Sequence, residues 1–256
     1  MKRKAFTLAE TLITLGIIGV VAAMTLPVLI QKYNKIVWVN QLKKSVSVVE
    51  NGFKLAMAED EVELLSDTNL FLTIGNKYFD DNLVFSNFIS VLKKYFNITE
   101  TENDYSCTTD EYKTLSGETA EDYGLCFVGN KVYLNDGTIL FIDFMGQPEI
   151  KPTEIINQIK GFGGKMYSDI GLIEIDVNGK KNPNQYGRDR FSFILSDNGN
   201  IYPYSGIDYA LYSQQNAISS NSYYWRNNND CDKSNSDSIG SGCAARIIEN
   251  GWKMDY

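Results

Sequence analysis

The sequence contains no histidine among its 256 residues. This absence excludes the Ser-His and Cys-His pairs that activate many catalytic nucleophiles, and it excludes every metal site built on imidazole. A P-loop and a G-x-G-x-x-G fingerprint are also absent, because the glycine-rich run at 161–165 does not have the P-loop spacing. Acids such as Asp143 and Glu174 fall in strand patterns, and nothing in the sequence pairs them for catalysis. We therefore expect no enzymatic activity.

Positive charge and cysteine are also scarce. The formal net charge is −8 although 24 residues are basic, and three of these lie in the first four positions. Nucleic acid is therefore not an expected partner, because its phosphates would meet an acidic surface. The chain has only four cysteines, which suit an oxidising exterior. Its length allows one globular domain of ordinary size.

The most prominent feature that the sequence does have is an apolar run near its start. No residue from Leu12 to Ile30 is ionisable, and a helix of roughly 20 apolar residues spans the hydrocarbon core of a bilayer. Glu10 places a carboxylate at the beginning of this run, where a charge is costly unless a partner neutralises it. A cleavable secretory signal fits poorly, because its small-residue cleavage site follows the apolar core. Here the small residue, Ala5, precedes it.

This arrangement resembles the type III signal of type IV prepilins and type II secretion pseudopilins. In that family a basic leader ends in a small residue, usually Gly, which is followed by Phe and, at the fifth mature position, by Glu. Ala5, Phe6 and Glu10 occupy those positions here, and Pro27 falls where many members carry a proline. The resemblance implies that a prepilin peptidase cuts after Ala5 and N-methylates Phe6.

The resemblance further implies a structural subunit of a type II secretion pseudopilus or a type IV pilus. Such a subunit forms filaments with other pilins or pseudopilins, after an assembly platform has extracted it from the membrane. The ammonium of Phe6 in one subunit would then pair with Glu10 of its neighbour, so that two groups costly alone become one ion pair.

Lysines flank both ends of the apolar run, so the positive-inside count does not decide the orientation of the helix in the membrane. The orientation is therefore taken from the resemblance. The family is cleaved in the cytoplasm. We therefore expect a single-pass protein of the cell membrane with an extracytoplasmic globular domain, located in the filament after assembly. A different class stays open, namely a membrane-anchored, adhesin-like binding module that does not polymerise.

An apolar stripe continues beyond Pro27 at steps of three and four residues, which is typical of an amphipathic helix. The pilin resemblance implies one continuous helix to about residue 60, with its second half packed on a domain. We divide the chain into the leader 1–5, the membrane-spanning assembly helix 6–30, the amphipathic continuation 31–65 and the globular domain 66–256. The stripe consists of Val39, Leu42, Val46, Val49, Phe53 and Ala56.

Strand patterns dominate the second half of the domain. An Asn-Asp-Gly turn separates two of the predicted strands and indicates a β-hairpin, and short turns between the others favour an antiparallel meander. We expect an α+β fold that is pilin-like, with a long N-terminal helix packed on an antiparallel sheet and a loop-rich C-terminal region. Residues 66–104 are expected as an insert. The predicted strands are 131–134, 138–144, 171–177, 190–196 and 201–204, and the predicted short helices are 87–96 and 244–250, the latter capped by Gly251.

The turn-rich stretch 176–189 is a candidate calcium site. Asp176, Asn178, Asn182 and Asp189 could supply some of the six to eight oxygen ligands that Ca²⁺ takes. The stretch lacks the bidentate Glu of an EF-hand. The same side chains also hold turns together by bonding to the backbone, so a purely structural turn stays open beside the calcium site. No other cofactor is expected.

The four cysteines allow three pairings. Cys107 with Cys126 would close a polar, turn-rich loop, and Cys231 with Cys243 is similar to the C-terminal disulfide loop of pilins. We choose these two local pairs because short loops close easily.

Overall fold

The structure is a computed structural model, and it forms two compact units, Met1–Val37 and Trp38–Tyr256. The residues that it describes are 7–72, 82–104, 112–119, 129–144, 169–204, 231–232, 234–235 and 238–256.

Helix α1 extends over Leu8–Glu59, a length of 52 residues. Its large apolar side chains up to Ile30 are exposed, with Leu8 at 78% and Met24 at 72%. Within the described part of the chain, α1 is the one helix that is long and apolar enough to cross a membrane, by length and composition. Pro27 lies inside it and, lacking an N–H, leaves the carbonyl of Ala23 without its helical hydrogen bond.

The part of α1 that belongs to the second unit buries the predicted stripe. Val39, Leu42, Val49, Phe53 and Ala56 are buried in the main hydrophobic core, and Val46 packs against it half-buried. The helix ends at Glu59, close to the predicted end at about residue 60. The N–H of Val62 bonds to the carbonyl of Met57 at 3.1 Å, which closes the helix end.

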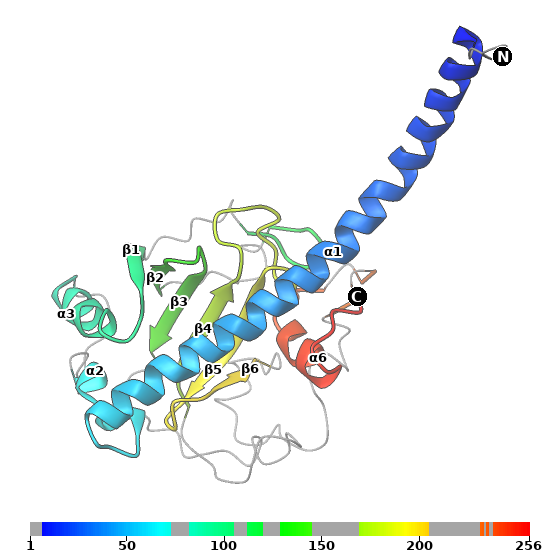
Figure 1. The fold of residues 1–256 in the computed structure, drawn as a ribbon. Coiled ribbons are helices and arrows are strands. Elements are labelled where there is room, and N and C mark those ends of the chain that lie inside the picture. Colours follow the sequence, from blue (N-terminus) through cyan, green and yellow to red (C-terminus); the bar gives the residue numbers. More distant parts are fainter. Residues whose placement is uncertain are drawn as a thin grey trace, which may run out of the picture. The chain divides into compact units, whose positions relative to one another are not determined.

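All six described strands form one sheet in which each strand pairs with the next one in the chain, antiparallel throughout. The predicted α+β fold, a long helix packed on an antiparallel sheet, is thereby confirmed (Figure 1). The strands are β1 Ile98–Asp104, β2 Gly129–Leu134, β3 Ile139–Phe144, β4 Asp169–Asp176, β5 Arg190–Ser196 and β6 Ile201–Pro203.

Strand β1 was not among the strands predicted from the sequence. Its sequence, ITETEND, has one large apolar residue and two glutamates, so it shows no alternation of apolar and polar side chains. Among the described strands it lies at the edge of the sheet and pairs with β2 alone, where a strand needs little burial. Charged side chains are common on edge strands because they oppose pairing with other chains.

The other helices among the described residues are short. Phe88, Ile89 and Leu92 of α3 are buried as predicted, although this helix begins five residues earlier than the predicted one. Helix α6 ends as expected, since Gly251 adopts a positive φ of 67° and Trp252 N–H bonds to the carbonyl of Ile247. The bounds are η1 Leu65–Asp67, α2 Asn69–Leu72, α3 Asn82–Leu92 and α6 Cys243–Glu249.

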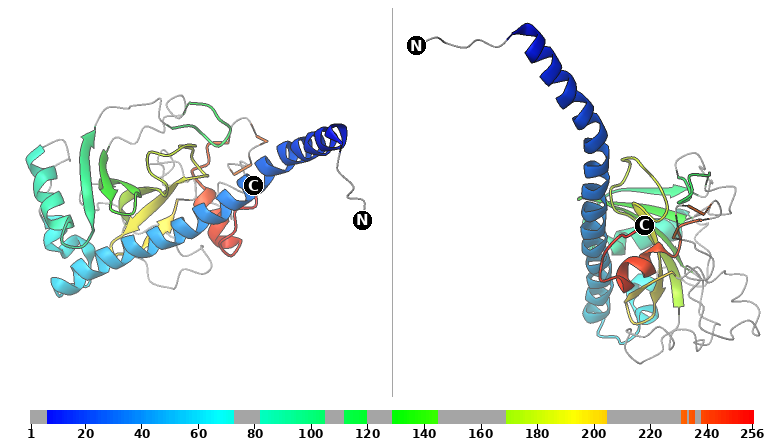
Figure 2. Two further views of the ribbon diagram at one scale, coloured as in Figure 1. Left: turned by 45° about the horizontal axis from the view of Figure 1, so that its top comes forward. Right: turned by 90° about the vertical axis from the view of Figure 1, so that its right-hand side faces the viewer.

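The two faces of the sheet carry different chemistry because side chains alternate along each strand. One face turns Leu140, Ile173 and Phe193 toward the core shared with residues 38–59 of α1, which run across that face (Figure 2). The opposite face holds Phe141 and a buried polar cluster around Arg190.

Gly52 lets α1 approach the residues after α3. A Cβ atom at position 52 would lie 2.3 Å from Cζ of Phe96, whose ring also packs edge-on against Phe53. We expect Gly52→Ala to lower the free energy of unfolding by about 1–3 kcal/mol, because the overpacked ring has to move. Chemical denaturation of the full chain in detergent measures this loss. Asn51→Ala, on the exposed side, is the control, and an unchanged midpoint for Gly52→Ala would contradict the close contact.

Candidate processing and assembly site

The polar end of α1 is built by Thr7 and Glu10. Thr7 precedes the helix, and its hydroxyl accepts a hydrogen bond from the Glu10 N–H at 3.2 Å. The Glu10 carboxylate in turn accepts from the Thr7 N–H at 2.8 Å and from its hydroxyl at 2.9 Å. This reciprocal pattern is a capping box, which satisfies N–H groups that the first helical turn leaves free. The carboxylate at the start of the apolar helix therefore has a partner within its own chain.

Thr7 was not among the site residues predicted from the sequence, although the sequence contains the pattern that would have predicted it. Threonine three residues before glutamate, ahead of an apolar run, is the sequence signature of a capping box. Three further threonines bond within the helix: the hydroxyls of Thr11, Thr14 and Thr25 donate to backbone carbonyls one turn earlier at 2.9 to 3.1 Å. These hydroxyls thus need no partner from outside the helix.

The other residues of the predicted site are separated along the chain. Ala5 and Phe6 lie outside the described residues. Pro27 lies 17 residues after Glu10 in the same helix, which corresponds to about 25 Å along the axis. Glu10 and Pro27 therefore lie at different levels of α1 rather than side by side.

The predicted calcium ligands Asp176 and Asp189 are both fully buried and hold the turn between β4 and β5. Asp176 accepts bonds from the N–H groups of Asn178 and Gly179 at 3.1 and 2.8 Å, and from the Tyr112 hydroxyl at 2.7 Å. Asp189 accepts from the N–H groups of residues 184 and 185 at 2.9 and 2.6 Å. These donors favour the structural-turn interpretation.

Two observations bear on a cation at the same place. The side-chain oxygens of Asn178 and Asn184 are buried without a hydrogen-bond partner among the described residues, which suits an oxygen ligand. The Asn182 side chain, by contrast, is exposed. Burial, and then the nearby Asp189, raises the pKa of Asp176 to about 7, and burial also raises the pKa of Asp189. The calcium site stays a prediction.

A buried ion pair lies on the same face of the sheet. Nε of Arg190 on β5 donates to the Glu174 carboxylate on β4 at 2.7 Å, and the side chains are 4% and 6% exposed. The hydroxyls of Tyr186 and Ser192 also donate to Glu174, at 3.0 and 2.8 Å. Burial alone would lower the pKa of Arg190, but the Glu174 carboxylate together with Tyr186 and Tyr112 raises that pKa above its usual value. Glu174 therefore accepts hydrogen bonds from Arg190, Tyr186 and Ser192 inside the fold.

Aromatic rings surround the Arg190 guanidinium. Its carbon lies 3.8 Å from the ring centre of Phe141, 4.1 Å from that of Tyr112 and 4.8 Å from that of Tyr186. Such contacts place the cation over the negative faces of the rings. We call Arg190, Glu174 and these three rings the arginine cage, which the sequence analysis did not foresee.

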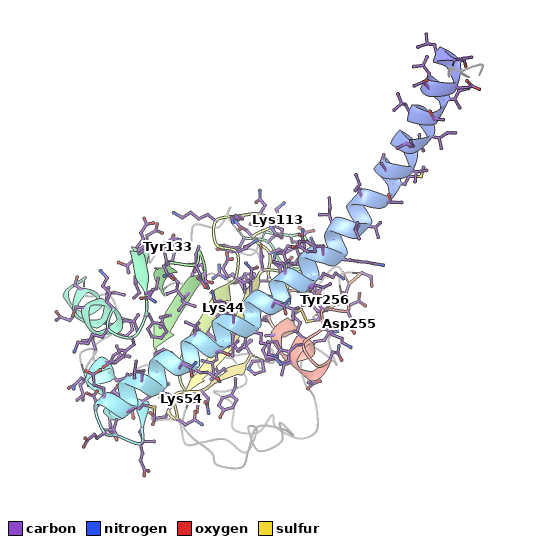
Figure 3. All side chains as sticks on the ribbon, in the orientation of Figure 1. Lys44, Lys54, Lys113, Tyr133, Asp255 and Tyr256 are labelled. Atoms are coloured by element: carbon purple, nitrogen blue, oxygen red, sulfur yellow. A yellow bond between two sulfur atoms is a disulfide. The ribbon has the colours of Figure 1, made fainter. Side chains whose placement is uncertain are left out.

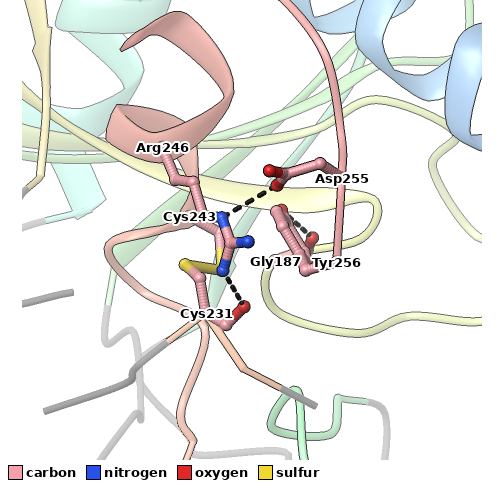
Figure 4. The surroundings of a disulfide bond; sticks show 6 residues. All are labelled: Gly187, Cys231, Cys243, Arg246, Asp255 and Tyr256. Atoms are coloured by element: carbon pink, nitrogen blue, oxygen red, sulfur yellow. Dashed lines mark hydrogen bonds and ion pairs between the residues drawn. A yellow bond between two sulfur atoms is a disulfide. The ribbon is translucent and has the colours of Figure 1, made fainter. Parts of the chain in front are cut away.

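The C-terminal segment is closed by a disulfide between Cys231 and Cys243, with an S–S distance of 2.08 Å. Figure 4 shows Arg246 of α6 beside it, donating to the carbonyl of Cys231 and to the Asp255 carboxylate, both at 2.8 Å. The Tyr256 hydroxyl donates to the carbonyl of Gly187 at 2.6 Å. These bonds attach the end of the chain to the turn after β4. The other expected pair, Cys107 with Cys126, lies outside the described residues.

Comparison with known proteins gives one family match. The description of that family is "Prokaryotic N-terminal methylation motif", and its model matches residues 1–26. No curated protein and no solved structure matches the chain. The matched range contains the basic leader, Ala5, Phe6 and the capped carboxylate of Glu10. The chain thus carries the N-terminal methylation signal of type IV pilins and pseudopilins.

Proposed function

We propose that the chain is a prepilin-like structural subunit that assembles into a type IV pilus or a type II secretion pseudopilus. The observation that carries this proposal is the methylation motif at residues 1–26 on a helix that continues far beyond it. The first part of that helix exposes apolar side chains, and the later part packs on a sheet. Such a helix supplies both a membrane anchor and a filament core.

In this mechanism Ala5 and Phe6 are the processing residues. A prepilin peptidase cuts between them on the cytoplasmic side and N-methylates Phe6, and the domain lies outside the cytoplasm. The buried disulfide between Cys231 and Cys243 supports an oxidising location for that domain.

Glu10 and Pro27 are the assembly residues. In a single subunit the Thr7 N–H and hydroxyl donate hydrogen bonds to the Glu10 carboxylate. These bonds lower the free-energy cost of placing the carboxylate in a membrane. In a filament the ammonium of Phe6 from a neighbour offers the same carboxylate a full opposite charge. Pro27 removes one helical hydrogen bond and so makes α1 easier to bend where it packs among other helices.

Processing is tested by the N-terminus of the mature protein. Material made together with a prepilin peptidase should begin at N-methylated Phe6, because the leader ends in the small residue Ala5. Intact-mass and N-terminal peptide mass spectrometry measure this. Chain made without the peptidase is the control and should retain Met1. A cut after Ala22 or Ala23, or an intact Met1 in the presence of the peptidase, would contradict the prepilin assignment.

A further inference from the structure

The outer side of α1 in the second unit is an exposed helix face with positive charge. The side chains at 40, 43, 47, 51 and 54 are exposed, and no described helix or strand covers this side in Figure 1. Lys43 and Lys54 are eleven residues apart, three helical turns, and so lie in one line. Lys43 reaches the ring of Trp252 at 5.6 Å, and no ion pair of Lys43 or Lys54 is found among the described residues. Figure 3 labels Lys54 on this helix.

The end of the same helix carries the opposite charge. Residues 59–67 contain five acids and no basic residue. Glu59, Glu61, Glu63 and Asp67 are exposed, and Asp60 binds the amide groups of Asn69 at 2.6 Å. We call residues 59–67 the acidic segment.

The acidic segment costs stability within its own chain. Carboxylates at the C-terminal end of a helix oppose the helix dipole, and the last turn of α1 has no basic residue. Glu61 also adopts a positive φ of 54°, at the position after a helix that glycine usually occupies.

We propose that the lysine face of α1, carrying Lys43 and Lys54, docks the acidic segment of a second copy of this chain. The proposal rests on the proposed function, since it names the contact between subunits of the filament. A face and its complement at different places on one molecule make a heterologous contact, which repeats without closing and so builds filaments. The separation of Glu61 from Lys54 and Lys43 along the helix sets the displacement between copies at roughly 10–27 Å.

Charge reversal tests the contact in the full-length chain, produced with its peptidase and assembly machinery. Lys54→Glu, or Glu61→Lys combined with Glu63→Lys, should lower the sheared filament fraction about fivefold, since repulsion replaces attraction at every subunit contact. The combination of all three changes should restore filaments. Glu118→Lys and Lys181→Glu are exposed controls away from α1 and should assemble normally.

A second variant separates assembly from folding. Glu61→Gly removes one charge and suits the positive φ, so it should raise the melting temperature of the full chain in detergent. The same variant should lower the filament fraction although it raises stability. A purely structural role of Glu61 cannot give this combination. Wild-type filament yields for both Lys54→Glu and Glu61→Gly would overturn the charge contact and leave the proposed function standing. Failure of the combined variant to recover filaments would also overturn the contact. Absence of filaments from the wild-type chain would overturn the proposed function and the contact with it.

Discussion

Replacing Glu10 with leucine is expected to abolish incorporation into filaments while membrane insertion and cleavage after Ala5 continue. In an isolated anchor this change should be harmless or improve insertion, because it removes a polar group from an apolar helix. In a filament it leaves the ammonium of Phe6 unpaired in a low dielectric, and losing one member of a buried pair typically costs about 3–5 kcal/mol. The change is therefore neutral or favourable for an isolated anchor and unfavourable for a filament subunit. The measurement compares the sheared filament fraction with the membrane fraction at matched expression.

Glu10→Gln is the matched control for the capping box. A glutamine can still accept from the Thr7 N–H, so the box survives while the charge is lost. Both variants should therefore fail to form filaments. Normal filaments from the glutamine variant would assign the effect to the cap of about 1 kcal/mol rather than to the ion pair. Failure of cleavage in either variant would mean that Glu10 serves the peptidase instead.

Replacing Glu174 with alanine is expected to destabilise the second unit by about 3–5 kcal/mol, because it leaves the buried Arg190 guanidinium without an opposite charge. Glu174 is 5% and Arg190 is 3% exposed, so water cannot replace the lost carboxylate. The hydroxyls of Tyr186 and Ser192 also lose their acceptor. Denaturant unfolding of the full chain in detergent, followed by tryptophan fluorescence, measures the change.

Two controls make the result specific to the arginine cage. Glu100→Ala removes an exposed glutamate from β1 and should shift stability by no more than about 0.5 kcal/mol. Glu174→Leu combined with Arg190→Leu replaces the pair by apolar groups and should recover part of the loss, because no charge is left unpaired. A loss below about 1 kcal/mol for Glu174→Ala would contradict the buried pair as placed here.

The extent to which the sequence predicted the fold depends on where the side chains of each element lie. Strand β5 was predicted with its observed bounds, 190–196, because its apolar residues alternate and a clear turn follows. Strand β1 was missed because an edge strand needs no apolar face. The end of α1 at Glu59 agrees with the predicted helix to about residue 60, although the sequence gives no sign that Glu61 adopts a positive φ.

The residues of the candidate site also differ in how well the sequence could predict them. Ala5, Phe6 and Glu10 could be predicted from sequence because they lie within a few residues of one another, inside the range 1–26 that matches the methylation motif. The T-x-x-E pattern of Thr7 and Glu10 is equally local and could have been identified from sequence too. The calcium ligands were chosen by residue type alone. The structure then showed that backbone N–H groups already occupy Asp176 and Asp189.

The N-terminal signal, the long helix and the order of most strands could be predicted from the sequence, because each depends on residue spacing within a short stretch. The pairing of Glu174 with Arg190, sixteen residues later and among rings from three different segments, could be seen in the folded chain alone. Alternation along a strand shows which side chains share a face of the sheet, but it does not show what covers that face. A buried charge needs a partner at hydrogen-bond distance, and that partner is set by strand register and by loops packed from elsewhere in the chain.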